Sequence, residues 1–335
     1  MIARVLATLL VLCLAACGGD VELPQARSLT NADAVLPQLY GAAGGPHEVA
    51  HQSYLLESAE RDLPLSISFP DTPGSYPVVL FSHGNWSDQF QYDNLIHHWV
   101  RHGYVVIAPY HDDGGGMARG IFNALRYGNL GMITRRVDDV RLVLDRLGEL
   151  GALLAPQSIN LDAEHIAVAG HSFGAFTAQQ FMGAAAWDVE SESWVRISDD
   201  RIDAVVAVSP PGPMFDEITA ESWLAMEGPV LMTTGTWDVN AQFWPEWQAH
   251  RLSFDTAVAG EQLALVVEGA DHYLGNLICR LDREEAPQHH ALAMVNAVSL
   301  AFLDAELKSQ TAARDFLRGP QLEESTQAFA RLLHR

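Results

Sequence analysis

The chain has 335 residues, of which 48% are hydrophobic and 19% are charged, so it is long and apolar enough for one large globular domain or two ordinary ones. Its net charge of −22 argues against a nucleic-acid partner and against electrostatic binding to anionic membranes. The charge does not exclude a neutral small-molecule ligand.

The first residues resemble an export signal. Arg4 supplies a positive charge, and residues 5–14 form an apolar segment that is too short to span a bilayer. Residues 14–17, Leu-Ala-Ala-Cys, resemble a bacterial lipobox, where lipoproteins are cleaved and then lipidated on the cysteine. We therefore expect a signal peptide over residues 1–16 and a lipid anchor on Cys17, which would hold the protein in the bacterial cell envelope on the periplasmic or outer-membrane side. A plain secretory signal with an incidental cysteine is the alternative.

The segment after the signal is rich in Gly, Ala, Pro and polar residues. We interpret residues 17–45 as a flexible tether and residues 46–335 as a single domain with a C-terminal helical extension. Cys13 would be removed with the signal, which leaves Cys279 as a free thiol and no internal disulfide.

Apolar strand-like segments alternate with helical periodicity through the rest of the chain. This alternation predicts an α/β fold with a mostly parallel, eight-stranded sheet and helices on both faces. The expected strands are 52–57, 63–69, 76–81, 104–109, 166–169, 202–208, 229–234 and 263–268, and the expected helices are 88–102, 134–150, the one that follows residue 172, 288–307 and one within 311–333. Three long connections, 111–133, 184–201 and 210–228, should lie over the carboxyl ends of the strands, where ligands bind in such sheets.

The apolar strand 166–169 runs directly into Gly170-His171-Ser172-Phe173-Gly174. A Gly-x-Ser-x-Gly sequence between a strand and a helix is typical of a nucleophile elbow, where glycines avoid collisions in a sharp turn and the serine is exposed at its tip. An ordinary turn between a strand and a helix is the alternative. The pattern predicts Ser172 as a nucleophile.

A serine nucleophile needs a base, and the base needs an orienting acid. In this architecture the chain order is Ser, then Asp or Glu, then His, and two later strand ends supply both partners. Asp238 follows the strand 229–234, and His272 follows the strand 263–268. We therefore predict Ser172 as nucleophile, His272 as base and Asp238 as orienting acid.

Other acidic and histidine residues fit these roles less well. Asp271 adjoins His272 and is expected to cap a turn or face solvent, while His250 lies in a helical stretch and is expected at the surface. The pair 289–290 is expected to be exposed at a helix start. Residues 111–113, His-Asp-Asp, lack a second ligand cluster at usable spacing, so we predict no metal site.

An oxyanion needs two hydrogen-bond donors. The first should be the amide of Phe173, which follows the nucleophile, and the second should come from the loop after the strand 76–81. There His83-Gly84-Asn85 allows the backbone to turn, so we predict the amide of Asn85 as the second donor.

These motifs resemble the α/β-hydrolase superfamily. Within it, Phe-Ser-His-Gly at 81–84, Gly-His-Ser-Phe-Gly-Ala at 170–175 and the helix 135–145 are similar to dienelactone hydrolase-like esterases, a group that overlaps the platelet-activating factor acetylhydrolases. The resemblance covers residues 64–303 and implies hydrolysis of carboxylic esters without a cofactor. Two positions depart from the family: dienelactone hydrolases use cysteine as the nucleophile, and the acetylhydrolases carry the acid where this chain has Ser209-Pro210.

Aromatic residues follow the proposed strand ends. We predict that Trp86, Tyr110, Trp237 and Tyr273 line an apolar substrate pocket, and that Phe243 and Trp247 belong either to this pocket or to the core face of a helix. No arginine cluster is apparent near the motifs, so we expect neutral, short-chain or lipid-like esters as substrates. Two alternatives stay open: a peptidase or amidase of the same fold, and a non-catalytic surface lipoprotein that binds lipid or a partner.

Overall fold

The computed structural model describes residues 21–335. The predicted signal peptide and Cys17 lie outside these residues. The main sheet consists of β1 (Val49–Leu56), β2 (Leu63–Pro70), β3 (Gly74–Ser82), β4 (Val105–Pro109), β5 (Ile159–His171), β8 (Ala204–Val208), β9 (Val230–Gly235), β10 (Gln262–Val267) and β11 (Ala330–His334). The helices of four or more residues are α2 (Ala32–Val35), α3 (Asp93–Arg101), α4 (Met117–Asp145), α5 (Leu147–Leu154), α6 (Phe173–Gln180), α7 (Leu252–Thr256), α8 (His289–Leu307), α9 (Thr311–Arg318) and α10 (Gln321–Ser325).

The strand order is β1-β2-β4-β3-β5-β8-β9-β10-β11, with parallel pairing from β4 through β10. β1 pairs antiparallel with β2, and β2 pairs antiparallel with β4. The ninth strand, β11, corrects the prediction of eight strands and of a purely helical C-terminal extension. Its residues adopt strand geometry because they pair antiparallel with the edge of β10, a tertiary contact that local sequence does not reveal.

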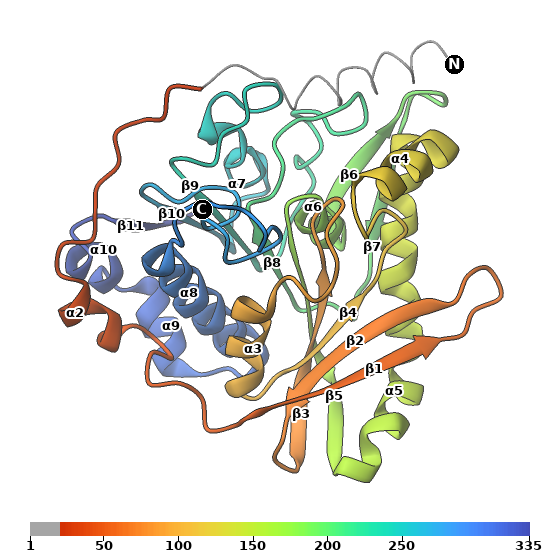
Figure 1. Cartoon of the computed structure of the whole chain (residues 1–335), viewed down its shortest axis with the longest axis horizontal. Coiled ribbons are helices and arrows are strands. Elements are labelled where there is room, and N and C mark those ends of the chain that lie inside the picture. The colour runs from red at the N-terminus through yellow and green to blue at the C-terminus, as the bar shows by residue number, and fades with distance from the viewer. Residues whose placement is uncertain (1–20) are drawn as a thin grey trace.

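The two faces of the sheet are covered by different helices (Figure 1). Successive strand side chains point to opposite faces, so Val79 and Phe81 of β3 pack with α3 and α8, while Val78 and Leu80 pack with α4, α5 and α6. Strands that are buried on both sides must be apolar along their whole length, which explains the continuous hydrophobic runs of the sequence.

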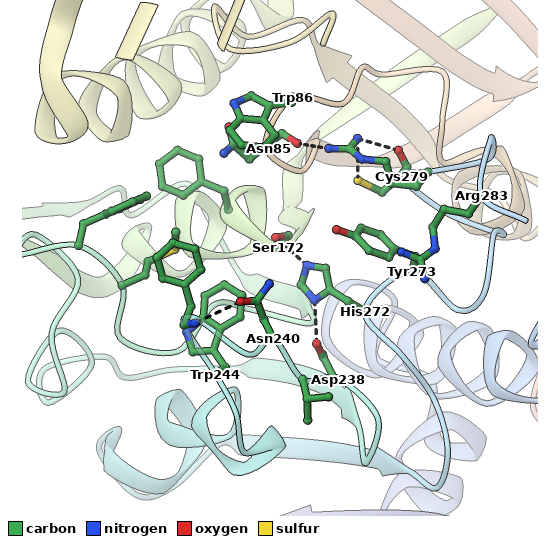
Figure 2. Close-up of a pocket in the computed structure, with 16 residues that line it drawn as sticks. Asn85, Trp86, Ser172, Asp238, Asn240, Trp244, His272, Tyr273, Cys279 and Arg283 are labelled. Carbon is green, nitrogen blue, oxygen red and sulfur yellow. Dashed lines mark hydrogen bonds and ion pairs between the residues drawn. The ribbon is translucent and has the colours of Figure 1, made fainter. Parts of the chain in front are cut away.

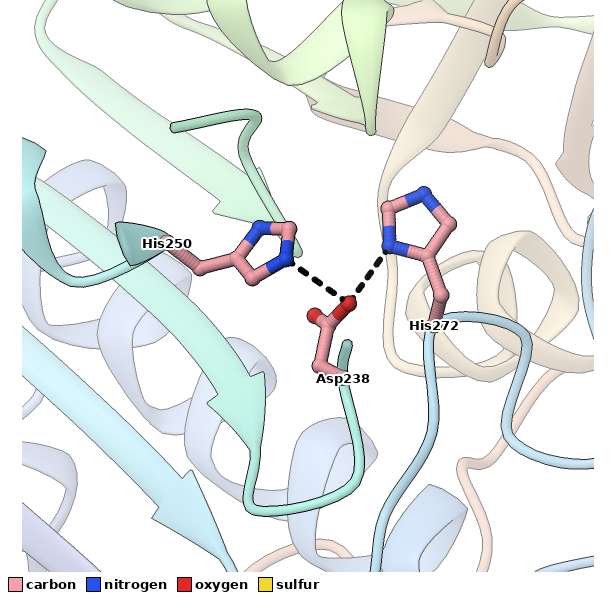
Figure 3. Close-up of side chains that lie close together, drawn as sticks. All are labelled: Asp238, His250 and His272. Atoms are coloured by element: carbon pink, nitrogen blue, oxygen red, sulfur yellow. Dashed lines mark hydrogen bonds and ion pairs between the residues drawn. The ribbon is translucent and has the colours of Figure 1, made fainter. Parts of the chain in front are cut away.

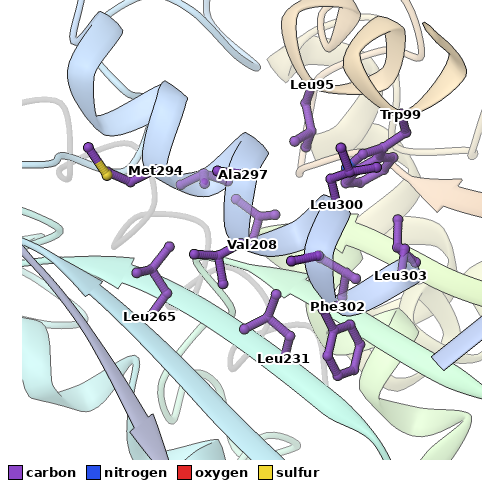
Figure 4. Packing of buried hydrophobic residues seen from close by; sticks show 14 of the residues in the cluster. Leu95, Trp99, Val208, Leu231, Leu265, Met294, Ala297, Leu300, Phe302 and Leu303 are labelled. Carbon is purple, nitrogen blue, oxygen red and sulfur yellow. The ribbon is translucent and has the colours of Figure 1, made fainter. Parts of the chain in front are cut away.

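Helix α8 is buried along most of its length, because the sheet and α3 pack against it. Figure 4 shows Met294, Ala297 and Leu300 of α8 among side chains of the sheet and of α3. By length and composition alone α8 would be able to cross a membrane, yet 72% of its apolar stretch is buried inside the fold.

The described part of the predicted tether packs against the domain. Leu29, Val35 and Leu39 are buried in the same core as α8, and Asn31 Nδ2 donates to the carbonyl of Ser325 at 3.0 Å. The interpretation of residues 17–45 as a flexible tether is therefore corrected from residue 29 onward. These three apolar residues follow no regular period, so the sequence pattern did not reveal that they are anchored.

The long connections have more structure than predicted. α4 begins at Met117 and contains a break at Gly128, whose φ is 71° and ψ 172°. The second connection forms an antiparallel hairpin of β6 (Met182–Asp188) and β7 (Ser193–Ser198). The third, residues 210–228, consists of turns and an isolated antiparallel bridge between Met214 and Ile218.

Candidate active site

Ser172 occupies the turn between β5 and α6, in a backbone conformation with φ 54° and ψ −123°. The turn is sharp enough to need both flanking glycines. A Cβ on Gly170 would lie 2.3 Å from the carbonyl oxygen of Gly174, and a Cβ on Gly174 would lie 2.0 Å from that of Ser82. This strain keeps Ser172 at the tip, as the pentapeptide predicts.

Three side chains that are far apart in the sequence meet at this tip (Figure 2). His272 Nε2 lies 2.8 Å from Ser172 Oγ, and His272 Nδ1 lies 2.8 Å from Asp238 Oδ1. The carboxylate accepts from Nδ1–H, which leaves Nε2 as the acceptor for the serine hydroxyl. The hydroxyl of Thr234 also donates to Asp238 Oδ2 at 3.1 Å. The structure thus brings together the serine, histidine and aspartate that the sequence predicts.

The carboxylate of Asp238 faces a second histidine, which the sequence prediction placed at the surface. His250 is fully buried, and its Nε2 forms an ion pair with Asp238 Oδ1 at 3.0 Å (Figure 3). The two imidazoles of His250 and His272 are 5.7 Å apart between ring centroids. A prediction of His250 as a surface residue is therefore wrong, because the turn Trp247–Ala249 directs this side chain inward against the acid.

The contacts of His250 favour a proton on each ring nitrogen. Nδ1 lies 2.6 Å from the carbonyl oxygen of Pro210, which only accepts, and Nε2 faces a carboxylate oxygen. Burial disfavours this cation, but the charge of Asp238 outweighs burial and raises the pKa of His250. Burial also opposes ionisation of Asp238, yet the two histidines hold its pKa well below the usual range. Asp238 therefore stays ionised between them.

The loop after β3 fixes the direction in which the backbone N–H of Asn85 points. The carbonyl oxygen of Gly84 accepts from His83 Nδ1 at 2.8 Å and from the guanidinium of Arg136 at 3.3 Å. Across a trans peptide the N–H points opposite to the C=O, so the Asn85 amide is turned away from these donors. Asn85 and Phe173 both line the cavity that contains Ser172. Among the described residues, neither amide donates to a protein acceptor.

A buried chain of hydrogen bonds ties the loops of the site together. The amide of Gly84 donates to the hydroxyl of Tyr92 at 2.7 Å, Tyr92 faces His171 Nδ1 at 3.1 Å, and His171 Nε2 faces the carbonyl of His272 at 2.8 Å. Burial lowers the pKa of His171 well below its ordinary value, so the ring is neutral, with Nε2 donating and Nδ1 accepting. Every donor in this chain has an acceptor, which fixes the loops that hold Gly84, Ser172 and His272 relative to one another.

A cavity of about 320 Å³ opens beside Ser172 and His272. Trp86 and Tyr273 line it, as predicted, and so do other aromatic side chains that the sequence indicated only in part: Phe173, Phe215, Phe243 and Trp244. Trp247 does not line it.

Two of the predicted pocket residues lie elsewhere. Trp237 points away from Ser172, and its Nε1 donates to the carbonyl of Pro24 at 2.8 Å. Tyr110 packs against Gly114 and the guanidinium of Arg119 instead of reaching the cavity. Both residues follow strand ends, as predicted. A place after a strand end does not determine the direction in which the side chain points, so the sequence could not exclude these two residues from the pocket.

The cavity is more cationic than the sequence suggested. Arg280 and Arg283 line it, so the expectation that no arginines address the site is corrected. Both come from the irregular segment between His272 and α8, where periodicity gives no signal for side-chain direction.

The remaining predicted alternatives have structural roles. Residues 111–113 engage in ion pairs and hydrogen bonds with the arginines Arg61, Arg135 and Arg136 and with Asp139, and burial raises the pKa of Asp139 to about 7. Asp271 accepts from the amides of Tyr273 and Gly275, so it caps a turn as expected. In residues 21–335, the ligand-type atoms of Asp238, His250 and His272 lie within 4.8 Å of one another, but both histidines already pair with the carboxylate of Asp238.

Comparisons with known proteins agree with this architecture. Residues 45–210 match the family model described as chlorophyllase, a range that includes Ser172 and ends before Asp238. Chlorophyllase-1 of Arabidopsis thaliana is 31% identical over 122 residues, which are 36% of this chain and 33% of that protein, so the chain matches about a third of the relative's length.

A solved structure of a ferulic acid esterase from Streptomyces cinnamoneus has a TM-score of 0.56 to this chain. The match covers 87% of this chain and 96% of the esterase at 18% identity. Together with the sheet order and the helices on both faces, it confirms the predicted fold class: the chain has an α/β-hydrolase fold.

Proposed function

We propose that the protein hydrolyses carboxylic esters through an acyl-enzyme intermediate on Ser172. The observation that carries the proposal is the line of hydrogen bonds from Ser172 Oγ through His272 to Asp238, with each step at 2.8 Å. A serine at a strained turn, a base in contact with it and an ionised acid behind the base are the groups that acyl transfer requires. The similarity to chlorophyllases and to an esterase structure supports this reaction class.

In the first half-reaction, Ser172 Oγ attacks the ester carbonyl carbon as its proton passes to His272 Nε2. The carbonyl electron pair moves to oxygen, and the amides of Phe173 and Asn85 stabilise the resulting oxyanion. Collapse of this intermediate breaks the bond to the alcohol oxygen, which takes the proton from His272 and leaves as the alcohol.

In the second half-reaction, water gives a proton to His272 and its oxygen attacks the acyl carbon. The new oxyanion occupies the same two donors. When it collapses, Ser172 Oγ leaves and recovers the proton from His272, which releases the carboxylic acid. Asp238 keeps its charge throughout and stabilises the imidazolium at each stage.

The shape of the cavity supports small or lipid-like esters as substrates. Its aromatic side chains offer an apolar surface for an acyl or alcohol group, and its volume of about 320 Å³ suits a small molecule. The narrower similarity to dienelactone hydrolase-like esterases and to platelet-activating factor acetylhydrolases stays part of this proposal and rests on the sequence motifs alone.

We also propose that Cys17 is lipidated and anchors the protein in the cell envelope. The support is the Leu-Ala-Ala-Cys sequence after an apolar segment. Cys17→Ser should move the protein from the membrane fraction to the soluble fraction, and an unchanged distribution would contradict the anchor without affecting the catalytic proposal.

The catalytic proposal is tested by hydrolysis of p-nitrophenyl butyrate. Ser172→Ala should reduce kcat to the level of the uncatalysed control. Ser209→Ala is the matched control, because Ser209 also follows a sheet strand and also has a positive φ, and it should keep most of the activity. Undiminished turnover by Ser172→Ala would reject Ser172 as the nucleophile. Turnover of the matched p-nitroanilide at a comparable rate would instead favour an amidase.

A further inference from the structure

The segment that follows His272 gives the cavity one cationic side. Tyr273, Arg280 and Arg283 all come from this segment, and all three line the cavity. Apart from Asp238, which is buried behind His272, no carboxylate of the described residues is among the lining side chains. In a chain with 42 acidic and 20 basic residues, two arginines in the lining beside the nucleophile are an unusual local charge.

Among residues 21–335, Arg280 contacts only neutral groups. Its guanidinium donates to the carbonyl of Asn85 at 3.0 Å and to that of Cys279 at 3.1 Å. A guanidinium has five N–H groups, so donors remain after these bonds. Among the described residues, Arg280 forms no ion pair. Its full positive charge is therefore held at the cavity wall without a carboxylate to neutralise it.

Arg283 is only weakly neutralised. The guanidinium lies over the ring of Tyr273, 4.7 Å from the centroid, and its one ion pair among the described residues is with the exposed Glu285 at 3.4 Å. Asp271 feels its charge too, since Arg283 acts to lower the pKa of that carboxyl against the effect of burial. Its Nε is buried and has no acceptor among the residues that the structure describes. A buried donor without an acceptor costs free energy, and a ligand acceptor would remove this cost.

Tyr273 packs directly against one of these charges, because the Arg283 guanidinium lies over its ring. Burial raises the pKa of the Tyr273 hydroxyl, so the group stays protonated. Within residues 21–335 the hydroxyl donates to no protein acceptor, so this neutral O–H is available to a ligand.

Figure 2 shows Arg283 and Tyr273 on one side of Ser172 and Trp244 on the other. An ester whose carbonyl lies at Ser172 therefore has an aromatic surface on one side and cationic donors on the opposite side. We propose that Tyr273, Arg280 and Arg283 bind a carboxylate of the substrate, so that the preferred esters carry an acidic group on one side of the scissile bond and an apolar group on the other. This inference rests on the proposed esterase function and names its substrate class.

Matched pairs of esters test the inference. p-Nitrophenyl hexanoate and p-nitrophenyl hydrogen adipate have acyl chains of equal length and differ in ending in a methyl group or a carboxylate. Phenyl acetates with a para carboxamide or a para carboxylate place the same difference in the alcohol. The wild-type protein should show a higher kcat/KM for the carboxylate member of at least one pair, and the pair that responds identifies the side of the ester that carries the acid.

Arg283→Gln is the informative variant, because Arg283 makes no contact with the oxyanion loop in the described structure. It should lower kcat/KM for the preferred carboxylate ester by about 10- to 100-fold, the effect of one hydrogen bond to a charged group. The rate for the neutral partner should fall much less, so the ratio of the two kcat/KM values should drop by about 10-fold or more. Arg318→Gln, which removes an equal charge at the exposed end of α9, is the matched control and should change neither rate.

Two results would overturn the inference: no preference for a carboxylate in either pair, or an equal loss on both members in Arg283→Gln. Benzoate offers a further readout, since it should inhibit hydrolysis of the neutral ester more strongly than benzamide does in the wild-type protein but not in Arg283→Gln. Turnover of the neutral esters tests the esterase function separately. If the wild-type protein hydrolyses them, Ser172→Ala does not, and the wild type shows no preference for a carboxylate, then this inference is rejected and the esterase function is not.

Discussion

Substitution of His250 tests how the carboxylate of Asp238 is stabilised in the site. Its Nε2 lies 3.0 Å from Asp238 Oδ1, and its Nδ1 lies 2.6 Å from the carbonyl of Pro210, with the ring fully buried. His250→Phe keeps a planar ring but removes both nitrogens. Removing one member of a buried ion pair costs about 3–5 kcal/mol, so we expect the free energy of unfolding to fall by that amount.

The same substitution should change the pH dependence of catalysis. At 5.7 Å between rings, the charge of His250 repels a second positive charge at the site by about 3 kcal/mol, for an effective dielectric constant of about 20. Without the charge of His250, the acidic limb of the kcat/KM profile should therefore move to higher pH.

His250→Gln is the matched variant. It removes the charge but keeps an amide that can donate to Asp238, so it should shift the acidic limb by a similar amount with a smaller loss of stability. Hydrolysis of p-nitrophenyl butyrate across the pH range and urea unfolding measure the two effects separately. An acidic limb that stays in place in both variants would refute a charged His250.

Three further predictions concern the same site. The stabilisation by His250 should be fully present below about pH 6.5 and lost as pH rises through its raised pKa, so urea unfolding should show wild type and His250→Gln converging as pH increases; a gap that widens would contradict the sign. Tyr92→Phe leaves the Gly84 amide and His171 Nδ1 without their partner, which should cost about 1–3 kcal/mol of stability for each group and lower kcat. Tyr104→Phe removes another buried hydroxyl and should lower stability at unchanged kcat. Equal kcat in both variants would argue against a positioning role for Tyr92. Gly174→Ala places a Cβ 2.0 Å from the carbonyl oxygen of Ser82, so its Tm and activity should both fall, and native values would contradict the elbow geometry.

Local sequence was sufficient where it encodes backbone geometry. Continuous apolar runs predicted the buried parallel strands, and the glycines at 170 and 174 predicted a turn that no larger residue fits. Because parallel strands end at the same edge of the sheet, residues that follow them, such as Asp238 and His272, were expected to meet there, and they do.

Local sequence was insufficient where side-chain direction depends on distant contacts. His250 follows a short turn whose entry angle is set by packing against the segment at Pro210, so its burial beside Asp238 carries no periodic signal. Trp237 is held outward by the carbonyl of Pro24, more than two hundred positions away along the chain. β11 likewise becomes a strand only because β10 offers it an edge.

The central claim is that Ser172 is a nucleophile activated by His272. The most direct measurement is mass spectrometry of the protein after reaction with a fluorophosphonate, with peptide mapping of the adduct. A single adduct on Ser172 that is absent from Ser172→Ala and strongly slowed in His272→Ala is the predicted result. An unlabelled wild-type protein, or an adduct on another residue, would contradict the claim.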